Sequence, residues 1–152
     1  MAATALSDGE ILARANQALP ADYVPHDDEE YMNERQQQFF RKLLIEWKRS
    51  LHSEAGGTLQ NLQDTPLREP DLTDRASSET DWGIELRTRD RQRKLISKIE
   101  AALRRIDEGE YGYCEVSGDP IGLQRLIARP VATMTVEAQE AHERREKISR
   151  ND

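Results

Sequence analysis

Cysteine and long apolar runs are scarce in this chain of 152 residues. Cys114 is the one cysteine, which excludes an intramolecular disulfide and a zinc site built from several thiolates. No stretch approaches the roughly 20 apolar residues that span a bilayer, and residues 1–10 lack a basic segment followed by an apolar one. We therefore expect a cytoplasmic protein that does not enter a membrane and has no crosslink in its core.

Apolar residues are few overall, and the charge is unbalanced. Hydrophobic residues make up 36% of the chain and charged residues 34%, which suits elongated helices with one buried side better than a sphere. The formal net charge is -7, so the overall field opposes binding to a nucleic-acid backbone. We expect an extended monomer that does not bind DNA directly.

Helical periodicity and turn residues divide the chain into four parts. A short amphipathic helix is predicted near the N-terminus, with Ser7 and Asp8 as caps and Pro20 as its end. The last helix is expected to dock through a stripe that includes Val136 and Ala141. The four parts are an N-terminal segment that packs on the globular base (1–32), a coiled-coil hairpin with its tip near 64–76 (33–108), a turn-rich region resembling a degenerate zinc finger (109–135) and a C-terminal helix (136–152). The predicted fold is mainly α, a long antiparallel coiled-coil hairpin on a small globular base.

The hairpin consists of two long helices, predicted over residues 33–63 and from Arg75 or Ala76 to residue 108. Their apolar residues recur three or four positions apart, so each helix has one apolar side. These residues are Phe40, Leu43, Leu44, Trp47, Leu51, Ala55, Leu59 and Leu62 in the first helix, and Trp82, Leu86, Ile96, Ile99, Leu103 and Ile106 in the second. The 3-4-3 spacing at the end of the second set is typical of a coiled-coil seam. Because Arg89 and Arg93 also fall at seam positions, we expect the middle of the hairpin to be less apolar than its base.

Acidic residues gather where the hairpin turns. Asp71 and Asp74 stand three residues apart at the entry to the second helix, and Ala76 follows. One interpretation is structural, because aspartates at a helix N-terminus cap exposed amides and favour the positive end of the dipole. The other is functional, because an acidic tip suits a bound divalent metal, an arginine-rich loop or a phosphate-handling site. Spacing alone leaves both interpretations open.

The turn-rich region has the outline of a zinc-binding knuckle without its ligands. Two Cys-x-x-Cys pairs would make a tetrahedral zinc site. Here Cys114 is followed by Ser117, and Thr135 and Ala138 stand where the second pair is expected. Serine, threonine and alanine cannot supply the missing thiolates, so we predict a metal-free region held by apolar packing.

Basic residues line the second long helix. They are Arg87, Arg89, Arg91, Arg93, Lys94 and Lys98, later joined by Arg125 and Arg129. Arg91, Leu95 and Lys98 follow at spacings of four and three, so they share a face that can offer cations to a phosphate-bearing ligand. The alternative is an ordinary solvated face.

A set of short segments carries a family resemblance over residues 29–147. The segments are Glu30-Tyr-Met-Asn-Glu34, the Asp71-x-x-Asp74-x-Ala76 tip, Glu85-Leu-Arg-Thr-Arg-Asp-Arg91, Lys94-Leu-Ile-x-Lys98-Ile-Glu100, Tyr111-Gly-Tyr-Cys114 and Arg125-Leu-Ile-Ala-Arg129-Pro130. Together they resemble the DksA family of RNA polymerase-binding transcription factors, in a cysteine-poor form that lacks the zinc ligands.

The resemblance implies a function and its residues. In that family the hairpin enters the secondary channel of bacterial RNA polymerase, where it contacts the largest subunits. The tip, here Asp71, Asp74 and Ala76, acts near the active centre. Ribosomal RNA promoters are inhibited and some biosynthetic promoters are activated. The effector ppGpp binds at a site shared with the polymerase. The positions that match this site are Arg91, Leu95, Lys98 and Arg129, and Gln139 stands where a lysine is usual.

Two other functions fit the same architecture. A Gre-type transcript-cleavage factor also has an acidic hairpin tip, although its hairpin comes first in the chain and here sequence flanks both sides. A structural coiled-coil adaptor would use the acids only as caps. An independent enzyme has the least support, because no nucleophile-base pair, phosphate loop or metal cluster is visible in the sequence.

Overall fold

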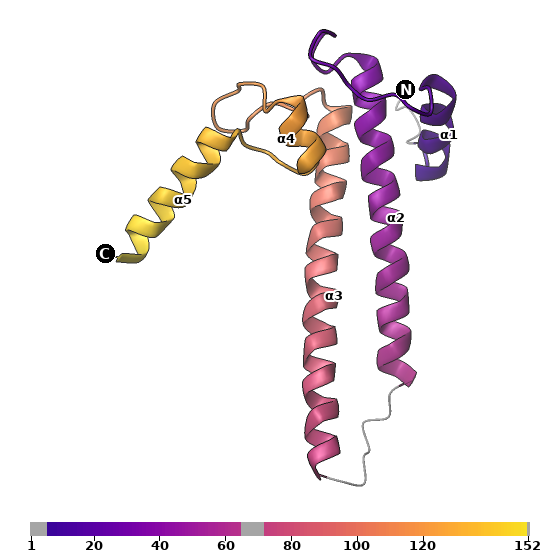
Figure 1. Ribbon diagram of the computed structural model, residues 1–152, viewed down its shortest axis with the longest axis vertical. Helices are drawn as coiled ribbons and strands as arrows, with labels where there is room; N and C mark the ends of the chain where they lie inside the picture. Colours follow the sequence, from indigo (N-terminus) through magenta and orange to yellow (C-terminus); the bar gives the residue numbers. More distant parts are fainter. Residues whose placement is uncertain (1–5, 65–71, 152) are drawn as a thin grey trace, which may run out of the picture. The chain divides into compact units, whose positions relative to one another are not determined.

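The computed structural model describes the backbone of residues 6–64 and 72–151, and the side chains of residues 6–54 and 79–149. Within these ranges the regular structure is helical, which confirms the predicted mainly α class (Figure 1). The helices are α1 (Asp8–Ala18), α2 (Glu34–Asp64), α3 (Leu72–Asp107), α4 (Leu123–Ala128) and α5 (Val136–Asn151). None of them, within the described ranges, combines the length and apolar character that a membrane crossing requires.

The chain divides into two compact units. The terminal unit comprises residues Met1–Ile45 and Ala101–Asp152, and the middle unit comprises Glu46–Glu100. The terminal unit therefore holds α1, α4, α5 and one end of each long helix. The middle unit holds the remainder of α2 and α3.

Helix α1 confirms the predicted N-terminal helix and its cap. The Ser7 hydroxyl accepts a hydrogen bond from the Glu10 amide (3.3 Å), and the Glu10 carboxylate accepts one from the Ser7 amide (3.1 Å). This reciprocal arrangement satisfies two amides that the first turn leaves unpaired. Leu12, Ala15 and Leu19 are buried, so the helix contributes one side to the core of the terminal unit.

The core of the terminal unit is made of side chains from several segments. Its buried members include Phe40, Leu44, Ile45, Ala102, Ile106, Tyr111, Leu123 and Leu126. The Phe40 and Tyr111 rings pack with centroids 5.4 Å apart. One polar side chain is also fully buried: Gln36 accepts from the Met32 amide (2.8 Å) and donates to the His26 carbonyl (3.4 Å). Its hydrogen bonds offset the cost of removing the amide from water.

In the middle unit, α2 and α3 lie side by side and antiparallel (Figure 1). Their predicted extents are confirmed, except that α3 begins at Leu72, three residues earlier than expected. Leu51, Ile96 and Ile99 are buried between them. Farther along α3, Thr88 and Gln92 are among the half-buried positions, and the Gln92 amide donates to Glu54 of α2 (3.1 Å).

The seam prediction was confirmed at Ile96, Ile99 and Ile106, which are buried, and was wrong for the middle of the helix. Arg89 is exposed, and the side chain of Arg93 is 79% exposed because it pairs with Asp90 (2.7 Å) on the solvent side. Leu86, expected in the seam, is also exposed. The middle of the helix pair is polar, as expected. Its half-buried polar residues include Thr88 and Gln92, each one position earlier in the chain than Arg89 and Arg93.

The C-terminal region differs from expectation in two ways. Helix α4 falls inside the region predicted to consist of turns, where Leu123 and Leu126 bury one face of a short helix. Helix α5 confirms the predicted last helix, but Val136 is 44% exposed and Ile148 is 62% exposed. The expectation that Val136 docks was therefore wrong. The helix start is capped by the Thr135 hydroxyl, which accepts from the Ala138 amide (3.1 Å).

Candidate functional site

The acidic tip lies where α3 begins. Asp71 falls outside the described residues, and Asp74 and Ala76 lie in the first turns of α3, where only the backbone is described. Because the helix begins at Leu72, Asp74 is its third residue rather than its cap.

The basic face of α3 is exposed in the middle unit. Arg91 and Lys98 are exposed and Leu95 is half-buried. Beside them lies a shallow hollow of about 390 Å³, lined by Ile84, Arg87, Asp90 and Arg91. Hydrogen bonds from Arg93 and Lys94 lower the pKa of the Asp90 carboxyl, so two cations of this helix are already paired. Arg91 and Lys98 do not take part in this ion pairing with Asp90.

The fourth residue of the predicted ppGpp site, Arg129, belongs to the terminal unit, as does Gln139, which stands where a lysine is usual. Arg129 caps the C-terminal end of α4 through its backbone amide, which donates to the Arg125 carbonyl (2.7 Å), and its side chain is exposed. Gln139 lies in the first turns of α5 and donates to Glu143 (3.0 Å). The set of four cation and leucine positions thus draws on both units, and its convergence on one ligand stays a prediction.

The turn-rich region forms a short hairpin, which we call the finger hairpin (residues 111–122). Its two sides are joined by hydrogen bonds from the Cys114 amide to Asp119 (2.8 Å) and from the Ile121 amide to Gly112 (2.8 Å). The turn closes with a bond from the Gly118 amide to the Cys114 carbonyl (2.9 Å). Gly118 has a φ of 77°, in the left-handed region that glycine tolerates best. A bond from the Glu115 amide to the Thr133 carbonyl (2.9 Å) ties the hairpin to the segment that precedes α5.

Three of the four degenerate ligand positions meet at the turn of this hairpin. Cys114 is 4% exposed, and burial raises the pKa of its thiol. Hydrogen bonds from the Ser117 hydroxyl and from the amides of Ser117, Thr135 and Val116 outweigh burial and lower the pKa to about 6. The backbone therefore folds around the sulfur as a metal knuckle does, with amides in contact with the thiolate.

These residues do not fit zinc. A structural zinc ion takes four ligands from cysteine, histidine or carboxylate side chains. Ala138 has no donor atom, the Thr135 hydroxyl accepts from the Ala138 amide (3.1 Å), and the Ser117 hydroxyl accepts from the Asp119 amide (3.3 Å). Among the described residues, no three histidine, cysteine or acidic side chains gather into a metal-binding group.

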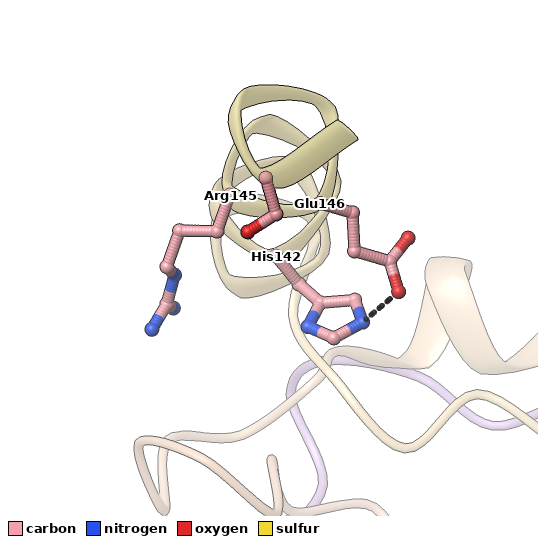
Figure 2. Close-up of a pocket in the computed structure, with 4 residues that line it drawn as sticks. His142, Arg145 and Glu146 are labelled. Carbon is pink, nitrogen blue, oxygen red and sulfur yellow. Dashed lines mark ion pairs between the residues drawn. The ribbon is translucent and has the colours of Figure 1, made fainter. Parts of the chain in front are cut away.

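A hollow on α5 was not predicted from the sequence. It has a volume of about 310 Å³ and is lined by His142, Arg145, Glu146 and Ser149 (Figure 2). His142 and Glu146 point toward one another, with the imidazole Nε2 3.1 Å from the carboxylate, while Arg145 extends away from them (Figure 2). Such a pair four residues apart is ordinary on an exposed helix and adds little stability.

Comparison with known proteins accounts for both long helices and the finger hairpin. Residues 36–106 match the family model "DnaK suppressor protein DksA, N-terminal domain", and residues 109–144 match "Prokaryotic dksA/traR C4-type zinc finger". A protein of Caulobacter vibrioides (strain NA1000 / CB15N), named RNA polymerase-binding transcription factor DksA, is 58% identical over 132 residues, which cover 87% of this chain and 93% of the relative. The chain belongs to the DksA family. The Escherichia coli (strain K12) protein of the same name is 43% identical over 125 residues, covering 82% of this chain and 83% of the relative.

A solved structure of the DksA family supports the same fold. The structure of transcription factor DksA2 from Pseudomonas aeruginosa is 39% identical, with a TM-score of 0.71, and the alignment covers 93% of this chain and 99% of that one. The DksA finger model is described as a C4 type, whereas this chain has Cys114 alone. The finger model thus matches a segment that lacks three of the four cysteines of a C4 site.

Proposed function

We propose that this protein binds bacterial RNA polymerase through the secondary channel and modulates initiation together with ppGpp. Asp71, Asp74 and Ala76 act near the polymerase active centre. Ribosomal RNA promoters are inhibited and some biosynthetic promoters are activated. The protein does this without direct DNA binding and without catalysis of its own, and it needs no zinc.

The observation that carries this proposal is the identity to the Caulobacter relative, which extends over 87% of the chain and whose name states polymerase binding. The helical structure is consistent with it, because Asp74 and Ala76 lie in the first turns of a helix of 36 residues. At 1.5 Å per residue such a helix is roughly 54 Å long. A helix of that length can carry a carboxylate deep into a channel.

Neutralising Asp74 tests the proposal. Asp74→Asn removes a charge but keeps the size of the side chain, and only a dipole interaction of roughly 0.3–1 kcal/mol is lost. We expect this variant to bind polymerase with similar affinity, to melt within a few degrees of wild type, and to fail to inhibit a ribosomal promoter in vitro. Asp71→Asn should fail less completely.

Asp81→Asn is the matched control, since it makes the same change on an exposed residue of the same helix. It should inhibit as wild type does. Full inhibition by Asp74→Asn would defeat the acidic-tip mechanism. Stimulated cleavage of backtracked transcripts by the wild-type protein would point to a Gre-type factor instead.

The ppGpp response should be present but weakened by Gln139. Losing one charge-assisted phosphate contact costs on the order of 1.5–3 kcal/mol, or roughly ten- to a hundredfold in affinity. We expect Gln139→Lys to strengthen the effect of ppGpp on inhibition, and Lys98→Ala to abolish it. Lys94→Ala is the control, because Lys94 already pairs with Asp90 (3.1 Å). No change with Gln139→Lys would mean that the ligand lies elsewhere.

A further inference from the structure

The finger hairpin raises the question of what holds it closed, since its ligand positions do not fit zinc. Its turn is fixed by the contacts around Cys114. Going from the turn toward the open end, the final backbone hydrogen bond between its two sides runs from the Ile121 amide to the Gly112 carbonyl. Beyond this bond lies the Gly122 amide, at the N-terminal end of α4. A side-chain contact that keeps the hairpin closed therefore has to act at this open end.

The Tyr31 hydroxyl lies at this open end. It donates to the Gly112 carbonyl (2.7 Å) and accepts from the Gly122 amide (3.1 Å), so one oxygen bridges the two sides of the hairpin. The Tyr31 ring packs edge-on against Tyr113, with centroids 5.6 Å apart. Tyr31 comes from the segment before α2, more than 80 positions earlier in the chain.

The space around this bridge is tight. A Cβ atom built on Gly112 would lie 3.1 Å from the Tyr31 hydroxyl and 3.0 Å from the Met32 sulfur, closer than ordinary contact. Gly112 also has a φ of 91°. Glycine is the residue that permits this close approach of the connector to the hairpin.

Arg105 adds a second fastening from the end of α3. Its guanidinium donates to the Glu110 carbonyl (3.2 Å) and to the Tyr113 carbonyl (3.0 Å). The Tyr113 contact falls on the first side of the hairpin and the Glu110 contact directly before it, whereas the Tyr31 hydroxyl joins the first side to the second and to the start of α4.

We propose that the Tyr31 hydroxyl is a clasp that keeps the metal-free finger closed and attaches it to the N-terminal segment. This gives residues 21–33 a role in organising the finger rather than in contacting a partner. It does not depend on polymerase binding, so its test can fail while the proposed function stands.

Cys114 is a built-in reporter for this clasp. It is the single cysteine of the chain and is 4% exposed, so a thiol reagent reaches it only when the hairpin opens. Tyr31→Phe removes the bridging oxygen and leaves the half-buried Gly122 amide without its acceptor. We expect Cys114 to be labelled roughly ten- to a hundredfold faster, the ratio that corresponds to one unmade buried hydrogen bond. Amide exchange at Gly122 should accelerate in parallel.

Two matched controls separate the clasp from general loosening. Tyr23→Phe removes a hydroxyl from the same connector, but that hydroxyl donates to Glu29 (2.8 Å) and not to the finger, so labelling should be unchanged. Gly112→Ala and Gly118→Ala both place alanine at positive φ, but only the first meets Tyr31 and Met32. Gly112→Ala should therefore expose Cys114 more than Gly118→Ala, even if Tyr31→Phe fails to fold.

The wild-type protein is also labelled after treatment with a zinc chelator and after addition of Zn²⁺. Neither treatment should change the rate. The proposal is overturned if Tyr31→Phe is labelled no faster than Tyr23→Phe. It is equally overturned if the chelator alone accelerates labelling of wild type, because a metal would then be the fastening.

Discussion

The terminal and middle units are stabilised in different ways. In the terminal unit, buried side chains come from α1, α2, α3, α4 and the finger hairpin, and side-chain hydrogen bonds join residues far apart in sequence. In the middle unit, the buried side chains among the described residues are Leu51, Ile96 and Ile99, and the polar pair of Gln92 and Glu54 joins the two helices. One unit depends on long-range packing, and the other mainly on helices whose own periodicity supplies a narrow seam.

This difference indicates which unit tolerates change. A core of interlocked aromatic and aliphatic groups loses several kcal/mol when one group is truncated, because the cavity cannot close. A narrow, partly polar seam has fewer such contacts to lose. The middle unit can therefore exchange seam residues at small cost, whereas the terminal unit must keep its shape.

The largest expected effect is at Phe40. The ring is fully buried and packs against Phe39 and Tyr111, with centroids 5.2 and 5.4 Å away. Phe40→Ala should lower the free energy of unfolding by about 3–5 kcal/mol in a denaturant titration. Ile148→Ala removes an apolar side chain that is 62% exposed and should change it by less than about 0.5 kcal/mol. Equal effects of the two would contradict the assigned core.

A smaller effect is expected at the cap of α1. Ser7→Ala removes the acceptor for the Glu10 amide and should cost about 1 kcal/mol of unfolding free energy. Ser7→Asp retains a capping oxygen and should remain close to wild type. If both variants melt like wild type, α1 contributes little to the terminal unit, and its buried Leu12 and Ala15 would have to be reinterpreted.

The smallest effect is expected in the seam of the middle unit. Gln92 is half-buried at the seam, and its partner Glu54 is exposed and can return to water. Gln92→Leu should raise the free energy of unfolding by up to about 1 kcal/mol, because apolar area replaces a polar side chain in the seam. A loss of stability instead would show that the hydrogen bond between α2 and α3 is worth more than the apolar contact.

The long helices were predictable because their cause is local. Apolar residues recur three or four positions apart along both α2 and α3. Which polar residues of α3 face the seam was not predictable. Thr88 with Gln92 and Arg89 with Arg93 have the same spacing, and only the position of the partner helix decides which pair faces it. The predicted start of α3, at Arg75 or Ala76, was too late. The prolines of the turn were expected to exclude helix up to that point, whereas the helix begins at Leu72.

The candidate sites were predictable only where a motif marks them. The segments around Asp74, Lys98 and Cys114 were found through a family pattern. Tyr31 was visible in that pattern, but its contacts with Gly112 and Gly122 were not, because no local spacing links residues so distant in the chain. Contacts of that kind are made by the tertiary fold and leave no periodic trace in the sequence.

The division into two units also separates the intrinsic fluorophores. Both tryptophans, Trp47 and Trp82, belong to the middle unit, and the four tyrosines belong to the terminal unit. Tryptophan emission therefore reports on the helix pair, and near-ultraviolet signals of tyrosine report on the finger and its core. A single unlabelled sample followed at both signals during denaturation gives one curve for each unit, and a gap between the two midpoints measures how far the units unfold independently of one another.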